Sequence, residues 1–161
     1  MITTEIDGLV NAVREAQAKL SVALEGITEE QLRKPPADGE WSVAQVLGHV
    51  IEMQPLWMEK AKLIASQDNP DVRRTPQEHE QRLQAVAKAE LTPWSELQRR
   101  LDEAGTRALG MLRQMFPHDL DCVGHRSAGQ TTTVRQMVES NLVGHIVEHA
   151  RQVEEARRSM H

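Results

Sequence analysis

The sequence predicts an all-α protein, a four-helix bundle in which a long crossover carries a short extra helix. Three observations support this fold class. Apolar residues recur at steps of three and four in four long segments, as on one face of an amphipathic helix. Each of these segments begins near a residue that commonly caps a helix. The 161 residues include three tryptophans, one phenylalanine and no tyrosine, so the core must be aliphatic, which suits helices better than sheets. The length fits one bundle domain over residues 1–161.

The first long helix is expected over residues 3–25. One of the two threonines at its start can cap it, and Gly26 stands where a glycine commonly ends a helix. Thr28 and Gln31 then form a capping box for one short helical turn. The segment KPPADGE that follows is typical of a loop. The apolar face of the first helix consists of Ile6, Leu9, Val10, Val13, Ala16, Leu20 and Leu24.

The second long helix is expected to begin after Ser42, which forms a capping box with Gln45. Pro55 falls inside the helical pattern. Because proline lacks the backbone donor and crowds the preceding turn, a kink is expected there. The apolar face consists of Val43, Val46, Leu47, Val50, Met53, Trp57, Ala61 and Ile64.

A long connection over residues 65–91 separates the second and third long helices. Residues 76–90 within it are predicted to form a shorter, mostly polar helix. The third long helix is expected to start with Thr92 as its cap, Pro93 in the first helical position and Glu96 completing the box. The long connection can return the chain to the same end of the bundle, which would interrupt a simple up-down order.

Residues 117–131 are predicted to form a loop, because glycine, aspartate and threonine are frequent there. The last long helix then begins at the capping box of Thr133 and Gln136 and continues to about Arg158. Its apolar face consists of Val134, Val138, Leu142, Val153 and Ala156.

Two histidines fill a gap in that apolar face. His145 and His149 lie between Leu142 and Val153, and their spacing of four places both rings on one side of the helix. A helix can present two nitrogens to one metal ion with this spacing. His49 lies on or beside the apolar face of the second helix. Because helical bundles build metal sites from facing helices, the three rings are predicted to converge on a divalent cation.

The free-energy cost of burying unpaired imidazole nitrogens favours a bound cation. Each unpaired buried nitrogen costs about 1–3 kcal/mol, and a metal ion satisfies one nitrogen of each ring. The other ring nitrogen then needs an acceptor, for which Glu52, Gln152 and Asn141 stand at suitable spacings. Three histidines leave an open coordination position, as in catalytic zinc sites. Glu52 is also the candidate for a catalytic base, although a solvated surface glutamate fits the pattern equally well.

Several alternatives remain open from the residues alone. The metal could be structural, or the histidines could be metal-free core residues bonded to their neighbours. His79, His118, His125 and His161 lie in polar or terminal segments and do not qualify as ligands. Tryptophans 41 and 57 are expected to pack the core. Arg135 and Arg151, which could bind an anionic thiol, are expected to be surface residues.

Charge and composition limit the classes of partner that the protein can be expected to bind. A net charge of −5 with scattered basic residues, including the pair Arg73 and Arg74, disfavours nucleic acid. The single cysteine, Cys122, excludes an internal disulfide. No apolar run reaches membrane-spanning length, and the acidic start does not look like a secretory signal. A cytoplasmic protein acting on a small molecule is the expectation.

The segments WSVAQVLGHVIEM and GHIVEHARQVEEAR resemble the DinB/YfiT-like superfamily. The shared features are a Trp-Ser helix start, a histidine seven residues after that serine, and H-x-x-x-H-x-x-Q in the last helix. The resemblance implies a four-helix bundle in which His49, His145 and His149 bind zinc or nickel, often in a homodimer. It implies a metal-dependent enzyme, either a transferase that joins a low-molecular-weight thiol to an electrophile or a hydrolase. The alternative is a non-catalytic, metal-binding and dimerising stress-associated protein.

Overall fold

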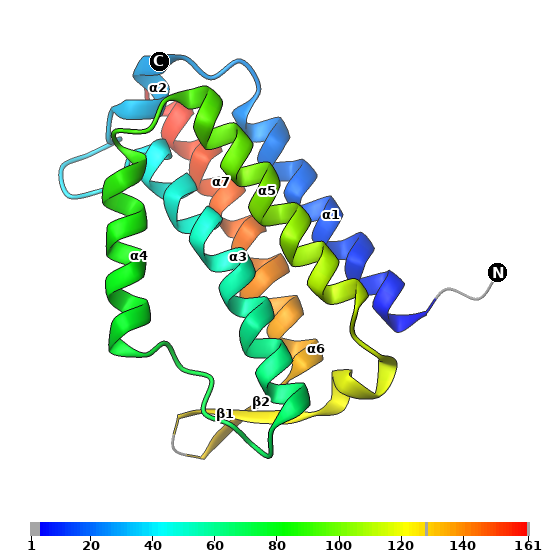
Figure 1. The fold of residues 1–161 in the computed structure, drawn as a ribbon. Coiled ribbons are helices and arrows are strands. Elements are labelled where there is room, and N and C mark those ends of the chain that lie inside the picture. The colour runs from blue at the N-terminus through cyan, green and yellow to red at the C-terminus, as the bar shows by residue number, and fades with distance from the viewer. Residues whose placement is uncertain (1–3, 128, 161) are drawn as a thin grey trace.

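Four long helices lie side by side and form the bundle that the sequence predicts (Figure 1). The structure is a computed structural model that describes residues 4–127 and 129–160. The first three bundle helices are α1 (Glu5–Leu24), α3 (Val43–Ser66) and α5 (Trp94–Arg113). The fourth is continuous through α6 (Val134–Met137), the π-helical turn η2 (Val138–Gly144) and α7 (His145–Arg158). None of the described helices is long and apolar enough to cross a membrane.

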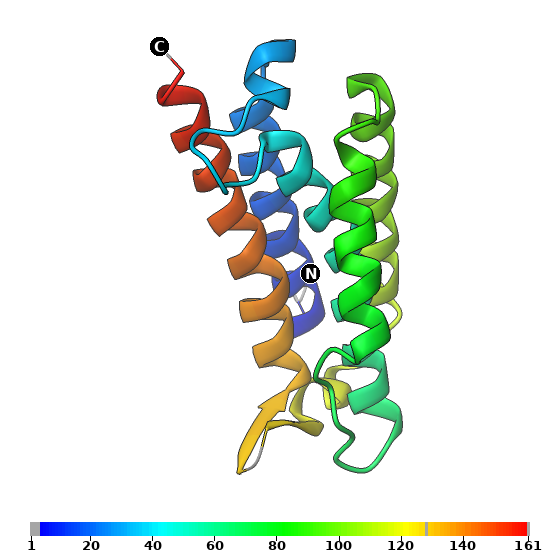
Figure 2. The same cartoon turned by 90° about the vertical axis from the view of Figure 1, so that its left-hand side faces the viewer.

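The shorter elements lie at the ends and on one side of the bundle. Helix α4 (Pro76–Ala89) packs along α3. In Figure 2, the ribbon of α4 is separated from that of the C-terminal helix. The short helix α2 (Glu29–Arg33) precedes α3. The 3-10 turn η1 (Pro117–Asp121) and the strands β1 (Val123–Ser127) and β2 (Gln130–Thr133) lie between α5 and α6.

Local capping explains where most helices begin. The hydroxyls of Thr4, Thr28, Ser42 and Thr133 each accept the backbone N–H three residues on, and the predicted boxes at the last three are confirmed. Gly26 has φ +68° just beyond α1, a conformation that favours glycine. The extra helix in the crossover is confirmed as α4. Pro55 lies inside α3 without ending it.

The predicted cap at Thr92 is wrong. Helix α5 begins at Trp94, and Pro93 occupies the cap position without a side-chain bond. The Thr92 hydroxyl instead donates to the carbonyl of Lys88 at 2.8 Å, so it closes the end of the preceding helix. Glu96 pairs with an arginine of its own helix at 2.7 Å rather than completing a box.

The segment predicted as a loop contains a β-hairpin. Strands β1 and β2 pair antiparallel, with Gly124 opposite Thr132. Asp71 adds a parallel bridge to His125, which ties the crossover to the hairpin. The run of three threonines that ends at Thr133 favours strand conformation. Strand pairing depends on partners that are distant in the sequence. The local content of glycine and aspartate does not indicate which segments will pair.

The C-terminal helix departs from regular α-helical geometry just before the two histidines. Its π-helical turn η2 places more residues in each turn, which changes the register of everything that follows. After this turn, Ile146 and Ala150 take the fully buried positions, while His145 and His149 are half-buried beside them. The predicted stripe is buried as expected, but Ile146 and Ala150 fill the gap within it and the two histidines lie at its edge, so the prediction that the histidines fill the gap is wrong.

The bundle core is aliphatic, as the scarcity of aromatic residues predicts. Val13, Leu47, Met53, Leu112 and Leu142 are among its completely buried side chains.

Helix α4 approaches α3 closely at a glycine. A Cβ atom on Gly48 would lie 2.6 Å from the backbone oxygen of Ala85 and 2.7 Å from the Cβ of Ala89. The sequence therefore permits this crossing only because residue 48 lacks a side chain. The crossing places α4 beside the part of α3 that carries His49.

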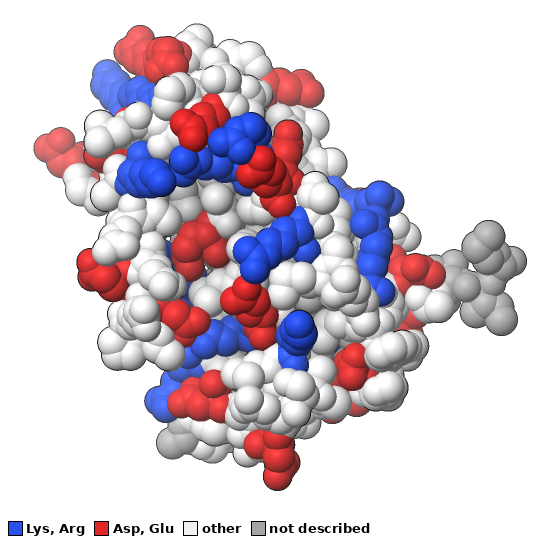
Figure 3. All heavy atoms as spheres, in the orientation of Figure 1, with Lys and Arg blue, Asp and Glu red and all other residues white. Residues whose placement is uncertain are grey.

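The surface in the view of Figure 3 carries charges of both signs, interspersed over the exposed helices. We see no face of uniform charge in this orientation.

Candidate metal centre

Three half-buried or buried imidazoles gather where α3 and α7 pack together. The ring of His49, from the second turn of α3, lies edge-on to the ring of His149, with centroids 5.0 Å apart. The rings of His145 and His149 are separated by one turn of α7, with centroids 6.2 Å apart. The structure therefore brings together the three residues that the sequence singled out.

The spacing of these rings can be compared with what a shared ion requires. Two imidazoles on one tetrahedral zinc, each with a Zn–N distance of about 2 Å, have ring centres about 5 Å apart. The pair of His49 and His149 has this separation, whereas His145 stands about 1 Å too far from His149. Within residues 4–127 and 129–160, no three His, Cys, Asp or Glu side chains are already arranged to hold a metal ion. Shared ligation thus requires His145 to move inward.

The ring nitrogens of the cluster are suited to a cation. Nδ1 of His49 and Nδ1 of His145 are buried without a hydrogen-bond partner, which costs about 1–3 kcal/mol each. Burial lowers the pKa of His145 below 6.5, against the raising effect of Glu148. Burial also lowers the pKa of His149, against the hydrogen bond with Gln152. Neutral rings with available lone pairs are the form that ligates metals, so the donor set fits a divalent ion.

The predicted neighbour of His149 lies where the spacing places it. The Oε1 atom of Gln152 is 2.9 Å from Nδ1 of His149. A ring N–H at Nδ1 donates to that oxygen and leaves Nε2 with its lone pair.

Glu52 lies beside His49 but is held chiefly by an arginine. Its Oε1 is 3.6 Å from Nδ1 of His49, beyond hydrogen-bond length, while both carboxylate oxygens accept from Arg74. Burial alone would raise the pKa of Glu52, but the contacts with His49 and Arg74 outweigh it and hold the pKa below 4.5. A paired, ionised and 13% exposed carboxylate is not a solvated surface group, and it is better suited to orient His49 than to accept a proton.

Asn141 does not contact His145 as predicted. Its side-chain oxygen accepts instead from Arg126 at 3.2 Å, and the residue is buried. The prediction assumed four residues of regular α-helix between the two positions. The π-helical turn occupies that interval, so they no longer stack on one face.

The arginines near the cluster are not Arg135 and Arg151, the two considered as binders of an anionic thiol. Arg135 pairs with Glu5 at 3.1 Å, and Arg151 is exposed. Arg74 and Arg126 are the guanidinium groups whose charges help to lower the pKa of His145. No local pattern distinguishes Arg74 from its neighbour Arg73, so the sequence offered no signal for its role.

A surface groove adjoins the cluster. Its volume is about 660 Å³, and its lining includes Trp41, Val46, Gln152 and Glu155. The ring of Trp41 lies 5.7 Å from that of His49, and Gln152 contacts His149. Trp41 packs against the core, as does Trp57, but it also forms a wall of this groove. The volume is in the range of small-molecule sites.

Comparisons with known proteins agree with the family resemblance and with the fold. The sequence model of the DinB superfamily matches residues 12–153. A candidate metal-dependent hydrolase of Geobacillus thermodenitrificans is 33% identical over 64 residues, which cover 40% of this chain and 36% of that protein. The candidate metal-dependent hydrolase YfiT of Bacillus subtilis is 33% identical over 67 residues, covering 42% and 38%. These alignments span little more than a third of the curated relatives' length.

Solved structures share the helical-bundle fold of this chain at low sequence identity. YfiT from Bacillus subtilis, described as having an unusual four-helix bundle topology, matches with a TM-score of 0.78 and 23% identity, over 99% of this chain and 90% of its own. A mycothiol-dependent maleylpyruvate isomerase matches with a TM-score of 0.75 and 13% identity, over 94% of this chain and 63% of its own. At these identities the likeness concerns the fold.

Proposed function

The chain belongs to the DinB superfamily, and from this premise we propose that it is a divalent-metal-dependent enzyme that acts on a small molecule. The observation that carries the proposal is the meeting of the buried or half-buried rings of His49, His145 and His149 between two bundle helices, with centroids 5.0 Å and 6.2 Å apart. The names of relatives as metal-dependent hydrolases support the same reading.

The three histidines would hold zinc or nickel, and their neighbours would orient them. Gln152 accepts from His149, and Glu52 faces His49. The groove beside Trp41 would hold the part of the substrate that does not react. A divalent ion held by three neutral rings supplies a Lewis acid that activates a nucleophile at neutral pH.

Two reaction classes suit such a site. In thiol transfer, the sulfur of a low-molecular-weight thiol bonds to an electrophilic carbon while the bond from that carbon to its leaving group breaks, and the leaving group takes up the thiol proton. In hydrolysis, water adds to an acyl carbon and the leaving group departs with a proton. The structural likeness to a mycothiol-dependent enzyme favours testing thiol transfer first.

A screen of the metal-loaded protein tests the proposal. Zinc- or nickel-loaded protein is offered cysteine, glutathione and a glucosaminyl thiol with a chromogenic electrophile, and chromogenic esters in parallel. We expect at least one conversion to depend on metal and to fall about 100-fold in His49→Ala, because a ligand is lost. His79→Ala, on the exposed face of α4, serves as the control and should retain full turnover. Equal rates in wild type and His49→Ala would reject the assignment of activity to this site.

A further inference from the structure

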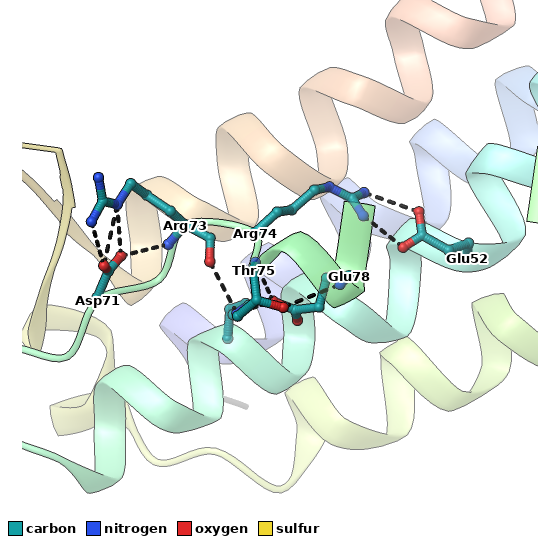
Figure 4. A network of polar contacts seen from close by, with 7 residues as sticks. Glu52, Asp71, Arg73, Arg74, Thr75 and Glu78 are labelled. Atoms are coloured by element: carbon teal, nitrogen blue, oxygen red, sulfur yellow. Dashed lines mark hydrogen bonds and ion pairs between the residues drawn. The ribbon is translucent and has the colours of Figure 1, made fainter. Parts of the chain in front are cut away.

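Two adjacent arginines of the crossover have opposite environments. Arg73 pairs with Asp71 at the surface, and its side chain is 60% exposed. Arg74 points in the other direction, toward Glu52 on α3 (Figure 4), and its side chain is 7% exposed. The buried arginine contacts Glu52, which lies beside the candidate ligand His49, whereas the side chain of the exposed arginine contacts Asp71.

Arg74 grips the carboxylate of Glu52 with two parallel hydrogen bonds. Its Nη1 donates to Oε2 at 2.8 Å, and its Nη2 donates to Oε1 at 3.0 Å. The guanidinium also lies over the ring of Trp57, 5.3 Å from the centroid. A bidentate pair supported by an aromatic face fixes the plane of the carboxylate as well as its position.

The backbone that carries Arg74 is itself anchored to α3. The buried Lys60 donates to Glu78 at 2.7 Å and to the carbonyl of Arg73 at 3.3 Å. Glu78 also accepts from the backbone of Thr75 in the capping box of α4. These bonds hold the residues on both sides of Arg74, so its guanidinium is presented at a defined place (Figure 4).

The clamped carboxylate faces the ring of His49. Glu52 Oε1, which accepts from Arg74, is also the atom 3.6 Å from Nδ1 of His49. A carboxylate on this side of the ring favours the tautomer with the proton on Nδ1 and leaves Nε2 free to ligate. We propose that Arg74 is a positioning residue that acts through Glu52 to set the tautomer and orientation of His49. Its effect on metal affinity rests on the proposed function, whereas the tautomer is a property of the metal-free protein.

Nitrogen NMR of the imidazole rings in metal-free protein tests the first part. We expect His49 of the wild type to carry its proton on Nδ1, and Arg74→Met to show a mixture of both tautomers. Arg73→Met removes an equally sized arginine–carboxylate pair at the surface and should leave the His49 signals unchanged. An unchanged His49 tautomer in Arg74→Met would overturn the proposal.

Zinc titration of the same variants tests the second part. Loss of a residue that hydrogen-bonds to a metal ligand weakens metal binding by about 10–100-fold. We therefore expect the zinc affinity to fall by about 10-fold in Arg74→Met and by less in Arg74→Lys. The zinc affinity of Arg73→Met should equal that of the wild type. If Arg74 acts through Glu52, the variant Glu52→Gln/Arg74→Met binds no more weakly than Glu52→Gln alone. Fully additive losses, or equal losses in Arg73→Met and Arg74→Met, would contradict it.

The two measurements separate this inference from the proposed function. A wild type that binds no zinc but changes tautomer in Arg74→Met would reject the function and retain the positioning role. A wild type that binds zinc, with Arg74→Met unchanged in both measurements, would reject the positioning role alone. Arg74→Lys and Glu52→Gln carry the same comparisons if Arg74→Met does not fold.

Discussion

Alanine in place of His149 should abolish stoichiometric binding of zinc or nickel. The ring of this residue lies near both others, with centroid distances of 5.0 Å to His49 and 6.2 Å to His145. Removing it leaves two imidazoles on different helices, which are too few to hold a divalent ion firmly in competition with water. We expect the affinity, measured by titration against a chromophoric zinc chelator, to fall by more than about 100-fold.

His118→Ala is the matched control for this loss. His118 is exposed in η1 and stacks on Phe116, away from the cluster. The variant His118→Ala should bind metal as the wild type does. Far-ultraviolet circular dichroism should show the same helix content in His118→Ala and His149→Ala. Wild-type affinity in a folded His149→Ala would mean that this residue is not a ligand.

Alanine in place of Gly48 should destabilise the protein, although alanine favours helices. The added Cβ would lie 2.6 Å from the backbone oxygen of Ala85, so α4 must move away from α3. Forced overpacking of this kind costs about 1–3 kcal/mol of unfolding free energy. Urea unfolding at constant pH measures the change.

The same substitution in α5 provides a control of opposite sign. A Cβ on Gly110 would meet nothing within 4 Å. Gly110→Ala should therefore raise the free energy of unfolding by about 0.5–1 kcal/mol, because the unfolded chain loses freedom. A stabilised Gly48→Ala would show that α4 does not pack against α3 as described.

Much of the fold could be predicted because its signals are local. The caps at Thr28, Ser42 and Thr133 and the glycine after α1 fix helix ends through contacts within four residues. The hairpin of β1 and β2 escaped prediction because its register depends on pairing across a turn and on the crossover at Asp71. The cap at Thr92 was mispredicted because a hydroxyl between two helices can bond to the end of the first or to the start of the second.

The gathering of the three histidines was predictable from the sequence, and their surroundings were less so. Helical spacing was enough to place His145 and His149 together and to pair His149 with Gln152. The π-helical turn displaced Asn141, because backbone hydrogen-bonding register is not encoded in apolar periodicity. Arg74 could not be found, since its burial depends on the path of a crossover whose own anchors, Lys60 and Glu78, are ordinary charged residues in sequence.

X-ray absorption at the zinc edge of the loaded protein tests most directly whether one cation joins the two helices. We predict three imidazole nitrogens at about 2.0–2.1 Å, with one oxygen ligand from water in the remaining position. Reaching that count requires His145 to move inward from its 6.2 Å separation. A coordination shell with fewer than three imidazoles in the wild type, or one unchanged in His49→Ala, would contradict a shared metal centre between α3 and α7.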